Sequence, residues 1–212
     1  MSDTEAKDLD KRREELIQKL LEASESDDHK AVSRLLDEGA DITTKNSSGK
    51  TGLNLGVRRG HEEVVMTFIN HEIDVNISDI TRTRLMEAAQ AGQLKMVQIL
   101  FGHGAKVNLK SDDEGYSALI IAAKKDFPDV VGFLLQHGAD ETIEDNGGLT
   151  AVQWAEENGN DDDIRVFSEA WKKKGSSLHL ELLTAAKKGR GRLVRDLITA
   201  GDDIQTRDEI WP

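Results

Sequence analysis

The sequence of 212 residues has no cysteine, and this absence excludes several kinds of chemistry. Disulfide bonds, thiolate metal sites and a cysteine nucleophile are all ruled out. No stretch approaches the roughly 18 apolar residues that a membrane-spanning helix needs. The first residues, MSDTEAKDLDKRREEL, are charged where a secretory signal requires an apolar run. We therefore expect a soluble intracellular protein, cytoplasmic with the nucleus as the alternative.

Positive charge is scarce relative to negative charge. The chain has 28 Lys and Arg against 40 Asp and Glu, a formal net charge of −12. Such a chain repels nucleic-acid phosphates and anionic membrane surfaces at long range. We expect neither nucleic acid nor a membrane as partner. The hydrophobic content of 37% is nevertheless enough to build a core.

A short motif within residues 46–56, NSSGKTGLNLG, raises the question of nucleotide binding. The triplet Gly49, Lys50 and Thr51 has the form of the end of a phosphate-binding loop. The complete loop also needs a glycine five residues earlier, and that position is Thr44. The preceding residues are too polar for the buried strand that feeds such a loop. The triplet alone is weak evidence for a nucleotide site.

A longer pattern recurs along the chain. Hydroxyl residues head four similar units at Thr51, Thr83, Ser117 and Thr150, in steps of 32, 34 and 33 residues. In each unit a short stretch with small residues, such as LMEAAQAG, precedes a second stretch with apolar residues at i, i+1, i+4 and i+5. This pattern predicts two antiparallel helices. One such pair cannot bury both apolar faces alone, so the units must stack.

These units resemble the ankyrin repeat. The matching positions are the alanine pairs Ala88-Ala89 and Ala122-Ala123, the valine pairs Val64-Val65 and Val130-Val131, and the endings HGAKVN and HGADET. The chain departs from the family in having no proline after the hydroxyl residue of any unit. The resemblance implies an all-α solenoid of stacked antiparallel helix pairs, joined by β-turn or hairpin fingers. It implies about six repeats, of which the first and last are atypical.

The resemblance also suggests how the chain is divided. We expect residues 1–12 to be a disordered polar N-terminus and residues 13–175 to hold repeats 1–5 with an N-terminal cap. Residues 176–212 would form a further ankyrin-like repeat, which could be the start of a continuing stack. The chain stops where a following turn would begin, so it either ends in a stub or is a piece of a longer protein.

The repeat gives the triplet another role. Its three residues align with Gly115-Tyr116-Ser117 and Gly148-Leu149-Thr150, in the turn before a first helix. We predict that Thr51 caps that helix through its hydroxyl. Glycines that follow the second helices are predicted to adopt the left-handed conformation that ends a helix; they are Gly39, Gly104 and Gly138.

No group of residues indicates catalysis or metal binding. His71, His103 and His137 recur at equivalent positions, and equivalent residues of stacked repeats lie roughly 8–10 Å apart. Metal ligands must converge to about 2 Å from one centre, so this series cannot form a site. Neither Gly-x-Ser-x-Gly nor His-Glu-x-x-His is present. We predict no enzymatic activity, no cofactor and no metal.

Recognition of a partner remains. Ankyrin-like stacks bind proteins with the fingers and the exposed face of the first helices, so the resemblance implies a protein-interaction module acting as adaptor, scaffold or regulatory domain. The partner-binding residues we predict on this face are Lys50, Arg58, Arg82, Tyr116, Lys124, Lys125, Leu149 and Trp154. Their basic and aromatic character suits an acidic or extended segment of another protein, bound by a monomer.

Three other interpretations stay open. The same residues could be solvated lysines and arginines around one half-buried tryptophan, without a binding role. They could hold a phosphorylated small molecule or nucleotide in a ligand-sensing module. The chain could also be the regulatory part of a larger enzyme.

Overall fold

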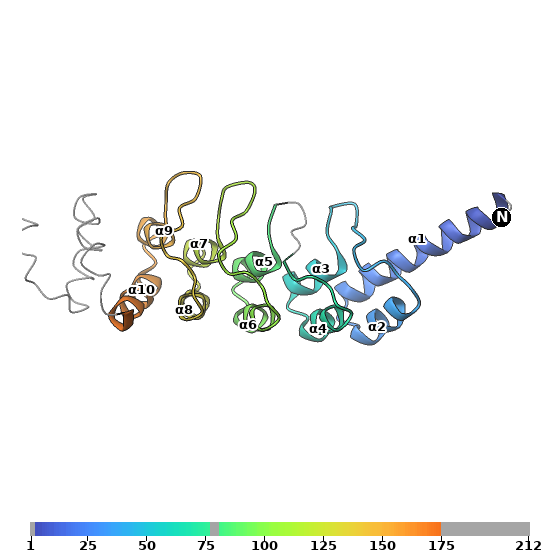
Figure 1. The fold of residues 1–212 in the computed structure, drawn as a ribbon, viewed down its shortest axis with the longest axis horizontal. Helices are drawn as coiled ribbons and strands as arrows, with labels where there is room; N and C mark the ends of the chain where they lie inside the picture. Colours follow the sequence, from blue (N-terminus) through green and yellow to red (C-terminus); the bar gives the residue numbers. More distant parts are fainter. Residues whose placement is uncertain (1–2, 77–80, 175–212) are drawn as a thin grey trace, which may run out of the picture. The chain divides into compact units, whose positions relative to one another are not determined.

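The structure, a computed structural model, describes residues 3–76 and 81–174, and these residues contain ten α-helices in two compact units. Unit 1 extends to Lys106 and contains α1 (Asp3–Glu25), α2 (His29–Asp37), α3 (Gly52–Arg59), α4 (Glu62–Asn70), α5 (Arg84–Gln90) and α6 (Leu94–Gly102). Unit 2 begins at Val107 and contains α7 (Ala118–Lys124), α8 (Pro128–Gln136), α9 (Ala151–Asn158) and α10 (Asp161–Lys174) (Figure 1). The repeat predicted for residues 176–212 lies outside the described residues.

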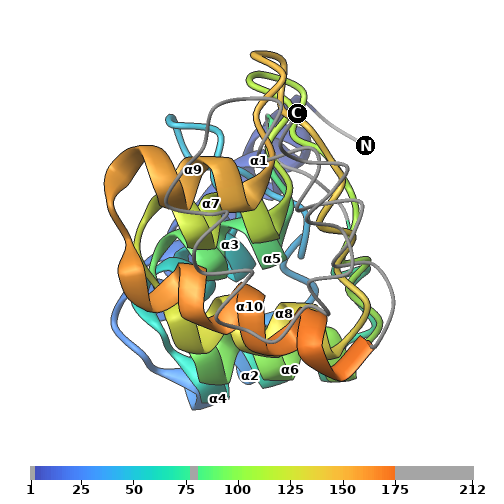
Figure 2. The same cartoon turned by 90° about the vertical axis from the view of Figure 1, so that its left-hand side faces the viewer.

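Both units are built from helix pairs. In unit 1, α1 packs against α2 and α3, and α3 packs against α4 and α5. In unit 2, α7 packs against α8 and α9, and α10 packs against both α8 and α9. Figure 2 shows α7 and α9 in one layer and α8 and α10 in the other. The predicted all-α fold of stacked antiparallel helix pairs is confirmed. We call α3, α5, α7 and α9 the inner helices, and α2, α4, α6, α8 and α10 the outer helices.

The segments before α3, α7 and α9 are hairpin fingers, as predicted. In the first, the Asn46 N–H donates to the Lys50 carbonyl oxygen at 2.9 Å, beside an antiparallel bridge between Lys45 and Thr51. In unit 2, the Asp145 N–H donates to the Leu149 carbonyl oxygen at 3.0 Å. The glycines that close these turns have φ near +75°: Gly49, Gly115 and Gly148, at 74°, 72° and 78°. This shared backbone confirms the register that was predicted for the Gly49 triplet.

Hydroxyl groups cap the starts of three inner helices, α3, α5 and α7. Thr51 Oγ1 accepts from the Asn54 N–H at 3.3 Å, which confirms the predicted cap. Thr83 and Ser117 do the same for Met86 and Ile120, at 3.4 and 3.2 Å. Past the C-terminal ends of α2, α6 and α8, the predicted left-handed glycines Gly39, Gly104 and Gly138 have φ of 90°, 87° and 84°.

The N-terminus differs from the prediction. Helix α1 begins at Asp3, so residues 3–12 are helical where a disordered segment is predicted. The physical reason lies in composition, because Glu, Lys, Arg, Ala and Leu are strong helix formers and no glycine or proline interrupts residues 3–25. Among the described residues no helix is both long and apolar enough to cross a membrane.

The alanine pairs of the inner helices are completely buried. Ala88 and Ala89 of α5 and Ala122 and Ala123 of α7 all have 0% exposure. A methyl group is the largest side chain that such a closely packed position accepts without displacing its neighbours.

We expect Ala88→Leu and Ala122→Leu each to lower the free energy of unfolding by about 1–3 kcal/mol, because the added atoms overpack the contacts between an inner helix and its neighbours. Chemical denaturation followed by circular dichroism measures the change. Ala91→Leu is the control, because Ala91 is exposed at the end of α5. Equal stability of all three variants would contradict the packing.

An ionisable side chain is buried in unit 2. Asp163, in the first turn of α10, is 0% exposed, and its carboxylate oxygens have no hydrogen-bond partner among the described residues. Burial, with the nearby charges of Asp126 and Asp162, raises the pKa of Asp163 from 3.8 to about 7. The carboxyl group is therefore neutral in mildly acidic solution and is forced to carry a buried charge above pH 7.

This raised pKa predicts a pH-dependent stability. The unfolded chain ionises Asp163 near pH 4 and the folded chain near pH 7, so its contribution is fully present below pH 4 and is lost as pH rises through 7. Asp163→Asn should therefore raise the free energy of unfolding by about 2–4 kcal/mol at pH 8 and leave it nearly unchanged at pH 4. Urea titrations at both pH values test this. Asp129→Asn, at an exposed position in the first turn of α8, is the control, and an equal effect of Asp163→Asn at both pH values would contradict the assignment.

Candidate functional site

The capping residues define equivalent positions in successive repeats. The residue before the cap lies at the end of the finger, and these residues are Lys50, Arg82, Tyr116 and Leu149. The fourth residue after the cap lies on the inner helix, and these residues are Leu55, Glu87, Ile121 and Trp154. The seventh lies near the end of that helix, and these residues are Arg58, Gln90, Lys124 and Glu157. Five of the eight predicted binding residues lie in two side-chain clusters, one in each unit: Lys50, Arg58, Tyr116, Lys124 and Trp154. A sixth, Leu149, lies in the finger before α9.

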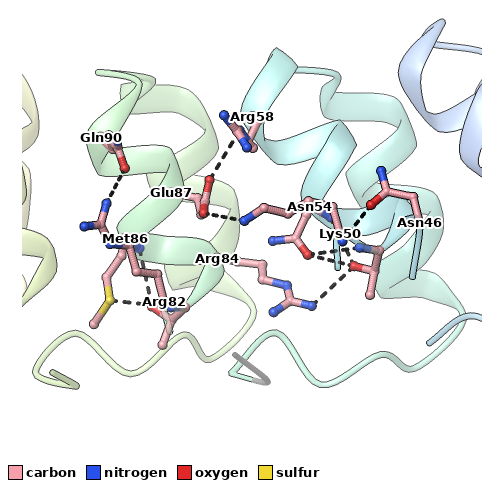
Figure 3. Close-up of polar contacts among 11 residues, drawn as sticks. Asn46, Lys50, Asn54, Arg58, Arg82, Arg84, Met86, Glu87 and Gln90 are labelled. Carbon is pink, nitrogen blue, oxygen red and sulfur yellow. Dashed lines mark hydrogen bonds and ion pairs between the residues drawn. The ribbon is translucent and has the colours of Figure 1, made fainter. Parts of the chain in front are cut away.

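In unit 1, the Glu87 cluster consists of Lys50, Arg58 and Glu87 (Figure 3). Lys50 Nζ lies 3.0 Å from Glu87 Oε1, and Arg58 Nε lies 3.5 Å from Glu87 Oε2. The Glu87 side chain is only 11% exposed and Lys50 20%, whereas Arg58 is 55% exposed. Each carboxylate oxygen thus faces one cation, and the cluster ties a finger and α3 to the following helix α5.

The neighbouring polar contacts also lie within unit 1. Arg82 Nη1 donates to Gln90 Oε1 at 2.7 Å, which joins the finger position of the third repeat to the end of its inner helix. Arg84 is 1% exposed, and its Nη2 donates to Thr51 Oγ1 at 3.4 Å (Figure 3). Arg84 occupies the position where the family has proline, and it contacts the capping residue of the preceding repeat.

In unit 2, the Trp154 cluster consists of Tyr116, Lys124 and Trp154. These residues occupy the same three repeat positions as the Glu87 cluster, one repeat pair further along the chain. Lys124 Nζ donates to Tyr116 Oη at 2.6 Å and lies 3.7 Å from the Trp154 ring centroid. The two rings pack edge to face, with centroids 6.1 Å apart. The ammonium group is thus held by two aromatic rings, an arrangement that favours a cation electrostatically.

Asp145 fixes this tryptophan. Trp154 Nε1 donates to Asp145 Oδ2 at 2.7 Å, while Asp145 Oδ1 accepts from the Gly147 and Leu149 N–H groups at 2.8 and 2.9 Å. Burial raises the pKa of Asp145, but the hydrogen bonds from Leu149, Trp154 and Gly147 outweigh it and hold that pKa below its ordinary value. One ionised carboxylate therefore orders both the finger and the indole.

The last two predicted residues make fewer contacts. Lys125 is the exposed residue that ends α7, and its side chain makes no hydrogen bond or ion pair with a described residue. Leu149 is half-buried in the finger that Asp145 caps.

Sequence reasoning missed Glu87, Asp145 and Arg84. The signal for Glu87 is present in the sequence, since it is a charged residue at a position where two other repeats have Leu55 and Ile121. Those two side chains are 8% and 3% exposed. Trp154 occupies the same repeat position. Each cluster is therefore centred on one of the two repeats in which this position is not aliphatic.

The finger amides of the Gly49 triplet are already used by the protein. Asn46 Oδ1 accepts from the Ser48 N–H at 3.0 Å and from the Lys50 N–H at 2.9 Å. The Gly49 N–H donates to the Asn46 carbonyl oxygen at 2.9 Å. A phosphate-binding loop needs such amides to be free for the ligand. Together with the Lys50–Glu87 ion pair, these bonds favour the capping role.

The recurring histidines have a local role. His71, His103 and His137 each end an outer helix, α4, α6 or α8. His71 Nδ1 lies 2.8 Å from the Thr67 carbonyl oxygen, and His137 Nδ1 lies 2.7 Å from that of Phe133. Within residues 3–76 and 81–174 no three His, Asp or Glu side chains are grouped so that they could hold a metal ion.

Comparison with known proteins agrees with this architecture. The family described as ankyrin repeats (3 copies) matches residues 20–111 and 105–175. The chain therefore belongs to the ankyrin repeat family.

Individual relatives share only part of their length with this chain. It is 32% identical over 126 residues to an ankyrin repeat-containing protein of Treponema pallidum, covering 58% of this chain and 42% of that protein. It is 33% identical over 105 residues to the B-cell lymphoma 3 protein homolog of Mus musculus, covering 49% and 23%. It is 29% identical over 106 residues to the ankyrin repeat and KH domain-containing protein mask-1 of Caenorhabditis elegans, covering 50% and 4%. The chain thus spans less than half of each of these three relatives.

We expect no nucleotide binding at the Gly49 triplet, because Asn46 occupies its amides and Glu87 neutralises Lys50. Isothermal titration of the full chain with ATP should give no binding heat at micromolar to millimolar concentration. Lys50→Ala serves as the comparison. Saturable ATP binding that Lys50→Ala abolishes would overturn this assignment.

Proposed function

We propose that this chain is a protein-interaction module, an adaptor, scaffold or regulatory domain, that binds a partner segment with its fingers and inner helices. Ankyrin repeats are generally protein-interaction modules, and the relatives above are ankyrin repeat proteins. The proposal includes no catalytic step. A monomeric state and a cytoplasmic location remain predictions from the sequence.

The observation that carries the proposal is the Trp154 cluster. Its tryptophan replaces an apolar residue that is buried in two other repeats, yet Trp154 is only half-buried. Core packing alone does not require a large amphipathic ring there. Tryptophan, tyrosine and arginine are the residues that most often carry binding energy at interfaces, especially when they are already held in place. Asp145 supplies that restraint through its bond to the indole.

Each unit also carries basic residues at its finger or helix-end positions. Lys50 and Arg58 share the single acid Glu87, so the Glu87 cluster keeps one net positive charge. Lys124 has two aromatic neighbours and no carboxylate ion pair among the described residues, and Lys125 is exposed. Positive groups at the surface of an acidic protein favour an acidic or extended segment and increase its association rate.

Trp154→Leu tests the proposal. Leucine occupies the equivalent position as Leu55, but the change removes the Trp154–Asp145 hydrogen bond, so we expect the free energy of unfolding to fall by about 1–2 kcal/mol while partner affinity falls by about 2 kcal/mol. Affinity capture with mass spectrometry should find proteins that bind the wild-type chain and are lost with Trp154→Leu. Surface plasmon resonance with the captured protein then measures the loss.

The control is Gln136→Ala, an exposed change at the end of the outer helix α8, which should retain the same proteins. If Trp154→Leu retains every partner of the wild-type chain at full affinity, the Trp154 cluster is not the binding surface.

A further inference from the structure

The two clusters use equivalent positions in different ways, and this difference indicates what the Trp154 cluster lacks. In the Glu87 cluster the finger residue and the helix-end residue are both cations, and a carboxylate of the protein lies between them. In the Trp154 cluster the finger residue is Tyr116, the helix-end residue is Lys124, and the third position is an indole. Two hydrogen-bond donors therefore remain, but the internal carboxylate has been replaced by an aromatic ring.

The donors of the Trp154 cluster have capacity left. A lysine ammonium carries three N–H groups, and Lys124 uses one on Tyr116 Oη. Tyr116 Oη accepts that bond, and its own hydroxyl proton has no acceptor among the described residues. Nζ and Oη are 2.6 Å apart, so both can point toward one external oxygen acceptor or toward the two oxygens of one carboxylate. Both side chains are half-buried, which strengthens such bonds relative to bonds in open water.

We propose that Lys124 and Tyr116 together bind a single carboxylate of a partner protein, an Asp or Glu side chain, with the Trp154 ring packed against the residue beside it. The inference rests on the proposed function, since it names the chemistry that the same surface recognises. Charge favours a carboxylate over a phosphate group. Lys124 and the ionised Asp145 nearly cancel, and Asp113 and Glu114 are exposed in the finger that ends at Tyr116, so the single ammonium group suits a monoanion better than a dianion.

The test uses the full chain and random linear peptides displayed on phage. Peptides that bind the wild-type chain should be enriched in Asp or Glu next to an aromatic or aliphatic residue. For one enriched sequence, two synthetic peptides are compared by isothermal titration, one with the acid and one with the matching amide. The wild-type chain should bind the acidic peptide about tenfold more tightly, which is the size expected for hydrogen bonds to a charged group.

Variants assign this preference to its donors. Lys124→Met should remove the preference for the acidic peptide. Tyr116→Phe keeps the ring, removes only the hydroxyl group, and should reduce the preference severalfold. Lys110→Met removes the same charge from an exposed position of unit 2 and should leave the preference intact. Thermal unfolding followed by circular dichroism verifies that each variant is folded. If Lys124→Met is unstable, Tyr116→Phe alone tests whether the preference for the acidic peptide depends on these donors.

The possible failures are distinguishable. If no peptide is enriched, the proposed function fails and the inference fails with it. If enriched peptides bind through Trp154 but acid and amide bind equally, or if the preference persists in both variants, the carboxylate site is wrong and the proposed function stands. Tighter binding of a phosphoserine peptide than of its glutamate counterpart would also overturn the carboxylate assignment.

Discussion

In α3, α5 and α7 a hydroxyl group at the start of the helix sets the register on which the rest of the repeat depends. Thr51, Thr83 and Ser117 each accept a hydrogen bond from the backbone three residues later. The cap fixes where the helix begins and therefore which side chains face the core and which face the finger. The buried alanine pairs and the left-handed glycines lie at constant distances from it. Without a proline in the first turn, this bond is the main local determinant of the helix start.

Because the frame is fixed, three surface positions can carry different chemistry without changing the fold. The same finger, mid-helix and helix-end positions hold an ion-pair cluster in unit 1 and an aromatic cluster in unit 2. The buried residues of α5 and α7 beside them are apolar except for Arg84. Stability and recognition are thus carried by different positions of the repeat, which is the physical basis for varying one while preserving the other.

The repeat, its caps and its glycines could be predicted from the sequence because each depends on residues close together in the chain. The pairing of Lys50 with Glu87 could not, since it joins side chains 37 residues apart across neighbouring repeats. The burial of Arg84 could not be predicted, because the sequence does not show whether a charged residue directly after the cap faces solvent or the core. The burial of Asp163 could not be predicted either, because it depends on the packing of α10 against α8 and α9. The mixed charge of residues 3–12 suggests disorder, whereas their helix propensity favours the helix that forms.

Asp145 connects two parts of unit 2, the finger before α9 and the indole on α9. Its one oxygen holds the finger amides and its other oxygen holds the indole, so the ring cannot change rotamer without losing a hydrogen bond to a group that also orders the turn. A tryptophan restrained in this way loses little conformational entropy when another surface covers it. The restraint therefore acts on how long a complex lasts, because a side chain that is already ordered has less freedom to regain by dissociating.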